Sequence, residues 1–218
     1  MSAATTRRRA EVMTYVLPVR RRYVIAKRAF DLGVCLILLP AIVLALFVSA
    51  IAIRVDSPGP IVFKQQRTGR HGLRFGMFKF RTMVANAEEL KAELQHRSIV
   101  PAPDFKIIDD PRITRVGRFL RRTSLDELPQ ILNVIRGEMS LVGPRPTSFA
   151  SNTYDLWHTE RLEVLPGVTG LWQVVGRNAA TFDERLRLDI AYIDRMSFKL
   201  DLWILMQTVL AVVRRSGA

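Results

Sequence analysis

The longest uncharged stretch of this sequence, residues 32–53, constrains the fold more than any other feature. It reads LGVCLILLPAIVLALFVSAIAI, and 14 of its 22 residues are Leu, Ile, Val or Phe. On the membrane-insertion scale those residues contribute about −4 to −8 kcal/mol in total. A helix of this length is about 33 Å long, enough for the hydrocarbon core of a bilayer. Because a buried helix of a soluble protein rarely lacks a polar face over such a length, the run predicts membrane insertion.

Pro40 lies inside this run and removes one helical hydrogen bond, so we expect a kink there. Basic residues gather on both sides of the run, at 7–9, 20–22 and 27–28 before it and between 54 and 81 after it. Basic residues favour the cytoplasmic side of a membrane. A helix that bends at Pro40 and returns to the cytoplasmic face keeps both clusters on that side. The sequence therefore favours a re-entrant helix over a straight span, which is the alternative.

The charge of the chain is strongly positive, with 33 Lys and Arg against 20 Asp and Glu, a net charge of +13. This excess predicts a polyanionic partner, which is nucleic acid, a phosphate-bearing substrate or anionic lipid. The single cysteine, Cys35, excludes an intrachain disulfide framework and a Cys-based zinc site. Three scattered histidines, His71, His96 and His158, do not favour a His-rich metal site either.

Three parts are expected along the chain: a basic arm over 1–26, a re-entrant membrane helix over 27–55, and one compact cytosolic, membrane-associated domain over 56–218. Within the domain, the patterns predict strands at 61–64 and 73–82, and helices at 86–97, 124–136, 181–196 and 198–215. The last helix is too short to span comfortably. It fits an interfacial helix, with Trp203 at headgroup level, as well as it fits a core-packing helix.

Two adjacent carboxylates, Asp126 and Glu127, follow the arginine-rich segment 118–122. One interpretation is structural, because Ser124 and Glu127 have the spacing of a helix capping box. Pro129 fits that interpretation poorly, since the fifth position of a helix should donate a hydrogen bond. The other interpretation is chemical. Neighbours on a helix point about 100° apart, so one carboxylate can attack phosphorus while the other holds Mg²⁺.

An arginine is held between two prolines in the segment Gly143-Pro144-Arg145-Pro146. The prolines restrict the backbone, so the guanidinium of Arg145 is presented with little orientational freedom. A turn that merely contains an arginine has the same pattern. Rigid flanks favour an anion clamp at least as much, because a guanidinium binds phosphate in a bidentate manner.

Several motifs occur together in the order typical of one family. They are Lys27-Arg28-x-x-Asp31 before the apolar run, FKFRTM at 78–83, DPRIT at 110–114, TSLDELPQ at 123–130, GPRP at 143–146 and PGVTGLWQV at 166–174. Over residues 27–213 the chain resembles the bacterial sugar transferases, the monotopic polyprenyl-phosphate phosphoglycosyl transferases, in their short single-anchor form. One departure is Leu39, which stands before Pro40 where some members have a serine.

The resemblance implies an activity: transfer of a sugar-1-phosphate from a UDP-sugar to undecaprenyl phosphate, with release of UMP. The position that matches the family's nucleophile is Asp126, which would form a covalent phosphosugar intermediate. The position that matches its Mg²⁺ ligand is Glu127. Residues 56–218 would be the catalytic domain, at the cytoplasmic face of the bacterial inner membrane and in contact with phospholipids. No nucleic-acid partner is implied.

The resemblance also implies a fold and further site residues. The expected fold is α/β, mostly helical with a small β-hairpin, and carries a re-entrant membrane helix and interfacial amphipathic helices. The positions that match the family's substrate-phosphate arginines are Arg121 and Arg145. A Leu-Asp-x-x-Tyr pattern of the family matches at Asp189 and Tyr192. Weaker matches, as contacts to the donor, are Lys79, Arg81, Gln130, Gln173 and Arg177.

Two other interpretations of the sequence stay open. A membrane-anchored basic protein that binds nucleic acid or anionic lipid would use the same arginines. An inactive scaffold would keep the fold without turnover. Asp126 separates these interpretations, because only the transferase needs its carboxylate. The donor sugar, the glycan pathway and the oligomeric state are not encoded in any pattern that we can recognise.

Overall fold

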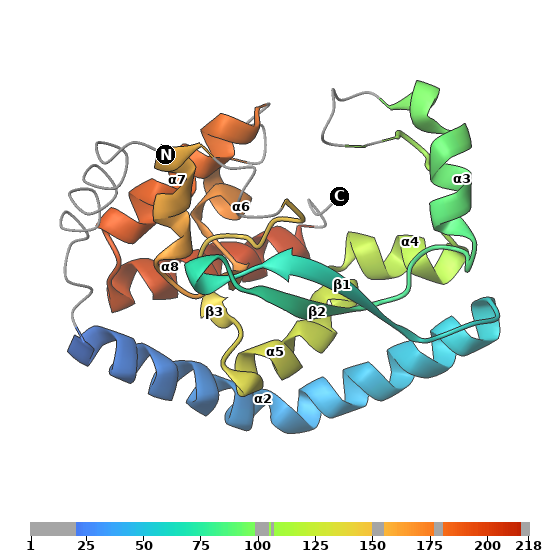
Figure 1. Ribbon diagram of the computed structural model, residues 1–218. Coiled ribbons are helices and arrows are strands. Elements are labelled where there is room, and N and C mark those ends of the chain that lie inside the picture. Colours follow the sequence, from blue (N-terminus) through green and yellow to red (C-terminus); the bar gives the residue numbers. More distant parts are fainter. Residues whose placement is uncertain (1–20, 99–104, 106, 150–154, 177–180, 215–218) are drawn as a thin grey trace.

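The computed structural model of the chain describes residues 21–98, 105, 107–149, 155–176 and 181–214. In this part of the chain the fold is mostly helical with small sheet elements, as predicted (Figure 1). Residues 1–20 of the expected basic arm (1–26) lie outside the described residues, whereas residues 21–26 are the start of the long N-terminal helix. Three parts are visible: a long N-terminal helix, a β-hairpin with short helices beside it and between it and the long helix, and a helical C-terminal part.

The long helix α2, Arg21–Asp56, contains the whole apolar run. It bends near its middle (Figure 1), and Pro40 lies within it, where the missing N–H and the ring favour a kink. Among the described residues, this is the one helix long and apolar enough to cross a membrane, and its most apolar window has a mean hydropathy of 3.0. Only 17% of that window is buried inside the protein, so the helix is not the core helix of a soluble fold.

A β-hairpin lies above α2. Strand β1, Val62–Thr68, pairs antiparallel with β2, Arg74–Phe80, and the register places Phe63 opposite Lys79. The predicted first strand was too short, because β1 continues to Thr68. The connection contains the 3₁₀ turn η1, Arg70–Gly72, in which His71 and Gly72 both have positive φ angles. The hairpin is therefore regular up to a tight turn, and it presents the Lys79 end of β2 to the centre of the molecule.

Among the residues that the structure describes, five short helical segments follow the hairpin up to Arg136. They are α3 (Ala87–Glu93), η2 (Gln95–Arg97), α4 (Arg115–Arg122), η3 (Leu125–Gln130) and α5 (Ile131–Arg136). A single helix over 124–136 was wrong, because a 3₁₀ segment containing Pro129 precedes a short α-helix. The predicted capping box is also absent from the described residues: Ser124 has a φ of 57° and makes no side-chain cap hydrogen bond.

The C-terminal part begins with a short parallel pair that the sequence patterns did not predict. Strand β3, Ser140–Val142, pairs with β4, Gly167–Thr169, and the 3₁₀ segment η5, Leu156–Leu162, lies between them in sequence. Three-residue strands are too short to show a periodicity of two. The pair nevertheless matters, because the chain leaves β3 directly into the segment that contains Arg145.

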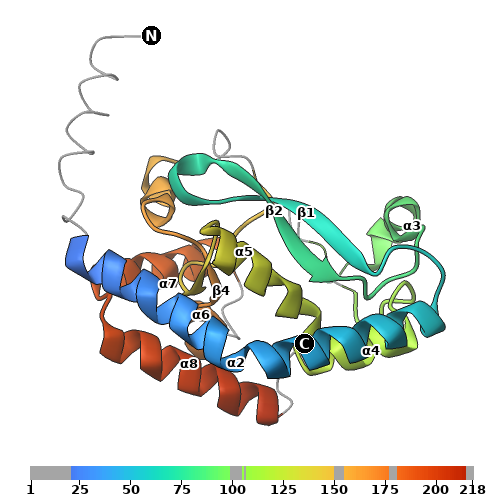
Figure 2. The same ribbon diagram turned by 90° about the horizontal axis from the view of Figure 1, so that it is seen from below.

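Helices α6 (Leu171–Val175), α7 (Phe182–Asp194) and α8 (Phe198–Val213) complete the fold. The prediction of a helix over 181–196 is confirmed, and Thr181 and Glu184 form a capping box at its start. Helix α8 runs beside the first half of α2 (Figure 2). Ile204 of α8 is fully buried, whereas Trp203 and Met206 are exposed, so one face packs on the core and another faces outward.

Polar side chains fasten α2 to the rest of the protein. Asp201 of α8 is fully buried and accepts hydrogen bonds from Tyr23 (2.7 Å) and Lys27 (2.8 Å) of α2. Asp31 accepts one from Ser140 of β3 (2.7 Å). The apolar helix is therefore an integral part of one folded unit, and its outward face carries large exposed side chains such as Leu36, Leu44 and Phe47.

Candidate active site

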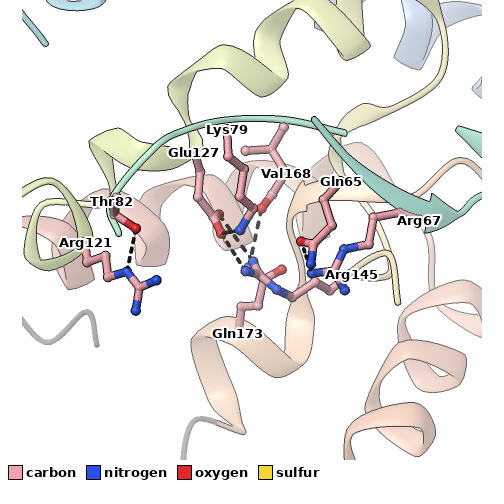
Figure 3. A network of polar contacts seen from close by, with 9 residues as sticks. All are labelled: Gln65, Arg67, Lys79, Thr82, Arg121, Glu127, Arg145, Val168 and Gln173. Carbon is pink, nitrogen blue, oxygen red and sulfur yellow. Dashed lines mark hydrogen bonds and ion pairs between the residues drawn. The ribbon is translucent and has the colours of Figure 1, made fainter. Parts of the chain in front are cut away.

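The centre of the site is an ion-pair cluster of Lys79, Glu127 and Arg145 (Figure 3). Nζ of Lys79 lies 2.9 Å from Oε1 of Glu127. Nη2 of Arg145 lies 2.5 Å from the same oxygen, and its Nη1 lies 3.2 Å from Oε2. The three side chains come from β2, from η3 and from the segment after β3. The fold thus brings together three predicted site residues that are far apart in sequence.

Local backbone geometry determines how the two carboxylates point. Ser124 has a left-handed conformation that ends the α4 turn and starts η3, in which successive residues are about 120° apart. Asp126 and Glu127 therefore point in different directions, as the chemical interpretation requires. Glu127 points at the two cations. Asp126, within the described part of the chain, accepts no hydrogen bond and forms no ion pair.

The charge of Glu127 is strongly stabilised. Burial works to raise the pKa of Glu127, but the charges of Arg145 and Lys79 outweigh it and hold that pKa well below its usual range. The side chain is 18% exposed, so the carboxylate is reachable from the solvent side. An ionised carboxylate has about four acceptor positions, and the three contacts above leave one for a further ligand.

Asp126 has a different environment. Burial and the neighbouring charge of Glu127 raise the pKa of Asp126, whereas Lys79, Arg121 and Arg145 lower it in part. A carboxylate with no partner of its own and three cations nearby is poised to meet an electrophile that carries negative charge. This combination distinguishes it from Glu127, which is already occupied by Lys79 and Arg145.

Arg145 is held from behind by two residues. Nη2 of Arg161 donates to the main-chain carbonyl of Arg145 and, over 2.6 Å, to Oδ2 of Asp189. Asp189 also accepts from the main chain of Arg145, and burial raises the pKa of Asp189 to about 6. Asp189, predicted as a substrate contact, is 1% exposed and helps to hold the main chain of Arg145. Arg161 was missed by the sequence analysis, because nothing local separates it from a surface arginine.

Two more predicted residues lie at the edge of the cluster. Nε of Arg121 donates to Oγ1 of Thr82 over 2.8 Å (Figure 3), and its guanidinium is near enough to Asp126 for the two charges to interact. Nε2 of Gln173, on α6, donates to the carbonyl of Val168 over 3.3 Å, and its side chain lies close to Arg145 in Figure 3. The arginine and the amide thus border the cluster on two sides.

Three predicted positions in the described part of the chain are not part of this cluster. Arg81 is buried and donates to the carbonyl and hydroxyl of Ser57 just after α2. Gln130 is 2% exposed. The hydroxyl of Tyr192 donates to Asp201 over 2.7 Å, on the side of the domain that holds α2. Arg177 lies outside the described residues.

The donor set fits Mg²⁺ only together with substrate phosphates. Among the described residues, no three His, Cys, Asp or Glu side chains group as a metal site. One carboxylate is enough for a Mg²⁺ ion when phosphate oxygens and water supply its other ligands. The fourth acceptor position of Glu127 agrees with such a shared site.

The chain is similar to several curated proteins. It is 42% identical over 211 residues to "Galactosyl transferase CpsE" of Streptococcus agalactiae serotype III, covering 95% of this chain and 46% of that protein. It is 44% identical to "Undecaprenyl-phosphate galactose phosphotransferase" of Salmonella typhimurium, covering 88% and 41%. The chain thus spans less than half the length of these relatives. "Exopolysaccharide production protein ExoY" of Rhizobium meliloti is 38% identical, and 88% of each chain is covered.

The family model described as bacterial sugar transferase matches residues 22–215. That match includes α2, the hairpin, the carboxylate pair and the support of Arg145, so it covers every element of the site described above. The resemblance inferred from the motifs is confirmed, and the chain belongs to the bacterial sugar transferase family.

Proposed function

We propose that this protein transfers a sugar-1-phosphate from a UDP-sugar to undecaprenyl phosphate, with release of UMP. The observation that carries the proposal is the contrast between the two carboxylates: Glu127 is bound to two cations, whereas Asp126 has no partner among the described residues and lies beside the same cations. The printed names of the relatives support the acceptor, since one is an undecaprenyl-phosphate galactose phosphotransferase and another an undecaprenyl-phosphate glucose phosphotransferase.

The first half-reaction is attack of a carboxylate oxygen of Asp126 on the β-phosphorus of the donor. A bond forms between that oxygen and phosphorus, and the bond from phosphorus to the bridging oxygen breaks. The bridging oxygen leaves with its electron pair on UMP, so the sugar phosphate stays on Asp126 as an acyl phosphate. The lack of an ion pair at Asp126 favours this role, because the carboxylate need not first give up a partner.

The second half-reaction returns the enzyme to its starting state. A phosphate oxygen of undecaprenyl phosphate attacks the same phosphorus, and the bond to Asp126 breaks. The electron pair returns to the carboxylate, and the product is a polyprenyl diphosphosugar. Because UMP leaves before the lipid reacts, one site can serve a soluble donor and an embedded acceptor in turn.

The cations around the carboxylates have distinct tasks. Arg145 and Arg121 bind and orient phosphate oxygens, for which a planar guanidinium is suited. Lys79 adds a buried positive charge, and burial lowers the pKa of Lys79. Mg²⁺ would be held by Glu127, with Asp126 beside it, and by phosphate oxygens. When bound, the ion would neutralise charge on the diphosphate.

The membrane arrangement follows from the same proposal. The acceptor is embedded in a bilayer, so its phosphate is presented at the interface, and the exposed apolar face of α2 would insert beside it. Basic residues flank α2 on both sides, which favours a re-entrant helix with the domain at the cytoplasmic face of the inner membrane. The outward side chains of α8, including Trp203, would contact phospholipids at the interface.

The test is release of UMP by purified protein given undecaprenyl phosphate, Mg²⁺ and a panel of UDP-sugars. We expect one donor to give Mg²⁺-dependent UMP. The variant Asp126→Asn should release none, whereas Asp194→Asn, a substitution of an exposed Asp at the end of α7, should behave as the wild type. Mass spectrometry of the protein mixed with donor alone should show an added phosphosugar in the wild type but not in Asp126→Asn.

Silence of the folded wild-type protein with every donor would contradict the proposal. Binding to anionic vesicles that is the same for wild type and Asp126→Asn would then favour the polyanion-binding interpretation. UMP release that persists in Asp126→Asn would be consistent with the transfer reaction but would show that Asp126 is not the nucleophile.

A further inference from the structure

An apolar groove of about 650 Å³ lies between the second half of α2 and α4, and its lining includes Leu125, the residue before the carboxylate pair. Its volume is within the roughly 300–1,000 Å³ typical of ligand sites. From α2 it is lined by small and aliphatic side chains, and from α4 and η3 by larger ones: Ala41, Leu44, Ala45, Val48, Ser49 and Ala52, and then Arg115, Val116, Phe119, Leu120 and Leu125. The space exists because α2 presents Ala and Ser where larger side chains would fill it.

The two helices that border the groove are fixed in position. The backbone N–H of Val116 donates to Asp56 over 3.2 Å, which attaches the start of α4 to the end of α2. On the other side of α4, a Cβ on Gly117 would lie 2.1 Å from the carbonyl oxygen of Thr82, so α4 packs against that backbone without space between them. Helix α4 is therefore restrained on two sides and does not collapse onto α2.

The groove has a direction. Its Arg115 end lies at the end of α2, where Val116 contacts Asp56. Its other end is formed by Leu125, whose neighbour in η3 is Asp126. Side chains on its rim are apolar and exposed, as shown by Leu44, Val48 and Phe119. One end thus adjoins the candidate nucleophile, and the length of the groove opens on the face of α2 that would lie in the bilayer.

The charge beside the groove fits an anionic head on an apolar chain. Helix α4 has four arginines and no carboxylate in its eight residues. Arg121, which lies on the Asp126 side, follows directly on the groove-lining Leu120. A lipid whose chain lies along the groove would place its phosphate beside Arg121, next to Asp126.

From this arrangement we propose that the groove binds the first isoprene units of the polyprenyl-phosphate acceptor and guides its phosphate to Asp126. The inference rests on the proposed function, since it assigns a place to the acceptor of that reaction. A phospholipid acyl chain has similar apolarity. The end of the groove at Leu125 favours the acceptor, because a lipid phosphate at that end lies where the second half-reaction needs one.

Direct labelling tests the proposal without relying on turnover. The probe is a short isoprenyl phosphate with a terminal benzophenone, irradiated with the full-length protein in nanodiscs. We expect labelled peptides from residues 41–52 and 115–125, and a loss of label in Ala45→Phe. Undecaprenyl phosphate should compete with the probe and reduce the labelling, whereas phosphatidylglycerol should not. Labelling elsewhere, or equal competition by both lipids, would overturn the proposal.

Kinetics of graded variants give a second test. Ala45→Leu and Ala45→Phe fill the groove progressively, whereas Val43→Phe places the same phenylalanine side chain at an exposed position of α2 outside it. For Ala45→Phe we expect KM for undecaprenyl phosphate to rise about tenfold, with a smaller rise for Ala45→Leu. KM for the UDP-sugar, which has no lipid chain, should change much less, and Val43→Phe should match the wild type.

The two half-reactions separate this inference from the proposed function. The burst of UMP measured with donor alone should be unchanged in Ala45→Phe, because the groove takes no part in that step. An unchanged KM for undecaprenyl phosphate in folded Ala45→Phe would overturn the groove assignment. If the wild type itself gives no UMP burst, the proposed function fails, while the labelling result still decides whether the groove binds a polyprenyl phosphate.

Discussion

Arg161 and Asp189 form a buried ion pair directly behind Arg145 of the Lys79–Glu127–Arg145 cluster. The guanidinium of Arg161 also donates to the main-chain carbonyl of Arg145, and Asp189 accepts from the main chain of the same residue. Neither residue reaches the carboxylate pair. Their task is therefore positional: they fix the backbone from which Arg145 extends to Glu127.

Activity should fall as the pH is lowered through about 6. Burial raises the pKa of Asp189 to about 6, so its carboxylate is ionised above that pH and pairs with Arg161. Protonation below pH 6 removes the charge and loosens the support of Arg145. We expect KM for the UDP-sugar to rise on the acid side, and we expect this rise to be absent from Asp189→Asn, whose KM should be high at every pH. A wild-type acid limb that persists unchanged in Asp189→Asn would contradict this assignment.

The contribution of Asp189 to stability should have the opposite pH dependence. Its pKa is higher in the folded protein than the ordinary value of 3.8, so the folded state binds the proton more tightly. The resulting stabilisation is complete below pH 3.8 and is lost as the pH rises to about 6, a change of roughly 3 kcal/mol. The difference in Tm between wild type and Asp189→Asn, measured from pH 4 to pH 7, should therefore change across this window and be constant above it.

Short motifs in the sequence were enough to find the carboxylates and Arg145, because each has an unusual local pattern. Pro129 was the local sign that an ordinary helix does not fit at 125–130, and η3 is indeed a 3₁₀ segment. The contact of Lys79 with Glu127 could not be predicted from a local pattern, since the two residues are 48 positions apart and the hairpin brings them together. The family resemblance supplied the position of Lys79 from the motif at 78–83.

Residues that act through other residues were harder to predict. Arg161 has no distinctive neighbours, and its role depends on contacts 16 and 28 residues away. Tyr192 was expected near the substrate, but its hydroxyl is bound to Asp201. The parallel pair β3 and β4 was missed because its strands have three residues each. Such features depend on tertiary contacts, which periodicity and motif spacing do not describe.

Replacing Glu127 by glutamine should weaken the binding of Mg²⁺ by the enzyme. The amide cannot balance the charges of Lys79 and Arg145, and it is a poor ligand for a hard cation. We expect the Mg²⁺ concentration for half-maximal UMP release to rise about tenfold or more. Glu89→Gln, at an exposed position on α3, is the matched control and should leave the titration unchanged. An unaltered Mg²⁺ titration in Glu127→Gln would remove Glu127 from the metal site.

Two glycine substitutions should have opposite effects on stability. In Gly117→Ala the new Cβ would lie 2.1 Å from the carbonyl oxygen of Thr82, so α4 must move away and strain its contacts. We expect a loss of about 2–4 kcal/mol and weaker donor binding, because Arg121 contacts Thr82. At Gly33, inside α2, nothing lies within 4 Å of the new Cβ. Gly33→Ala should therefore raise Tm slightly, since alanine favours a helix by about 1 kcal/mol. Equal Tm values for both variants would contradict the packing of α4 described above.

The buried Asp201 should be the main polar attachment between α2 and α8. It is fully buried and accepts from Tyr23, Lys27 and Tyr192, so Asp201→Asn leaves the ammonium of Lys27 without its ion-pair partner. We expect a loss of about 3–5 kcal/mol, against about 1 kcal/mol for Tyr23→Phe, which removes a single hydroxyl. The double variant Lys27→Met/Asp201→Asn should recover part of the loss, because it removes both charges. Thermal unfolding in nanodiscs gives all three values. No recovery in the double variant would show that the loss comes from the hydrogen bonds of Asp201 to the tyrosines rather than from an unpaired charge on Lys27.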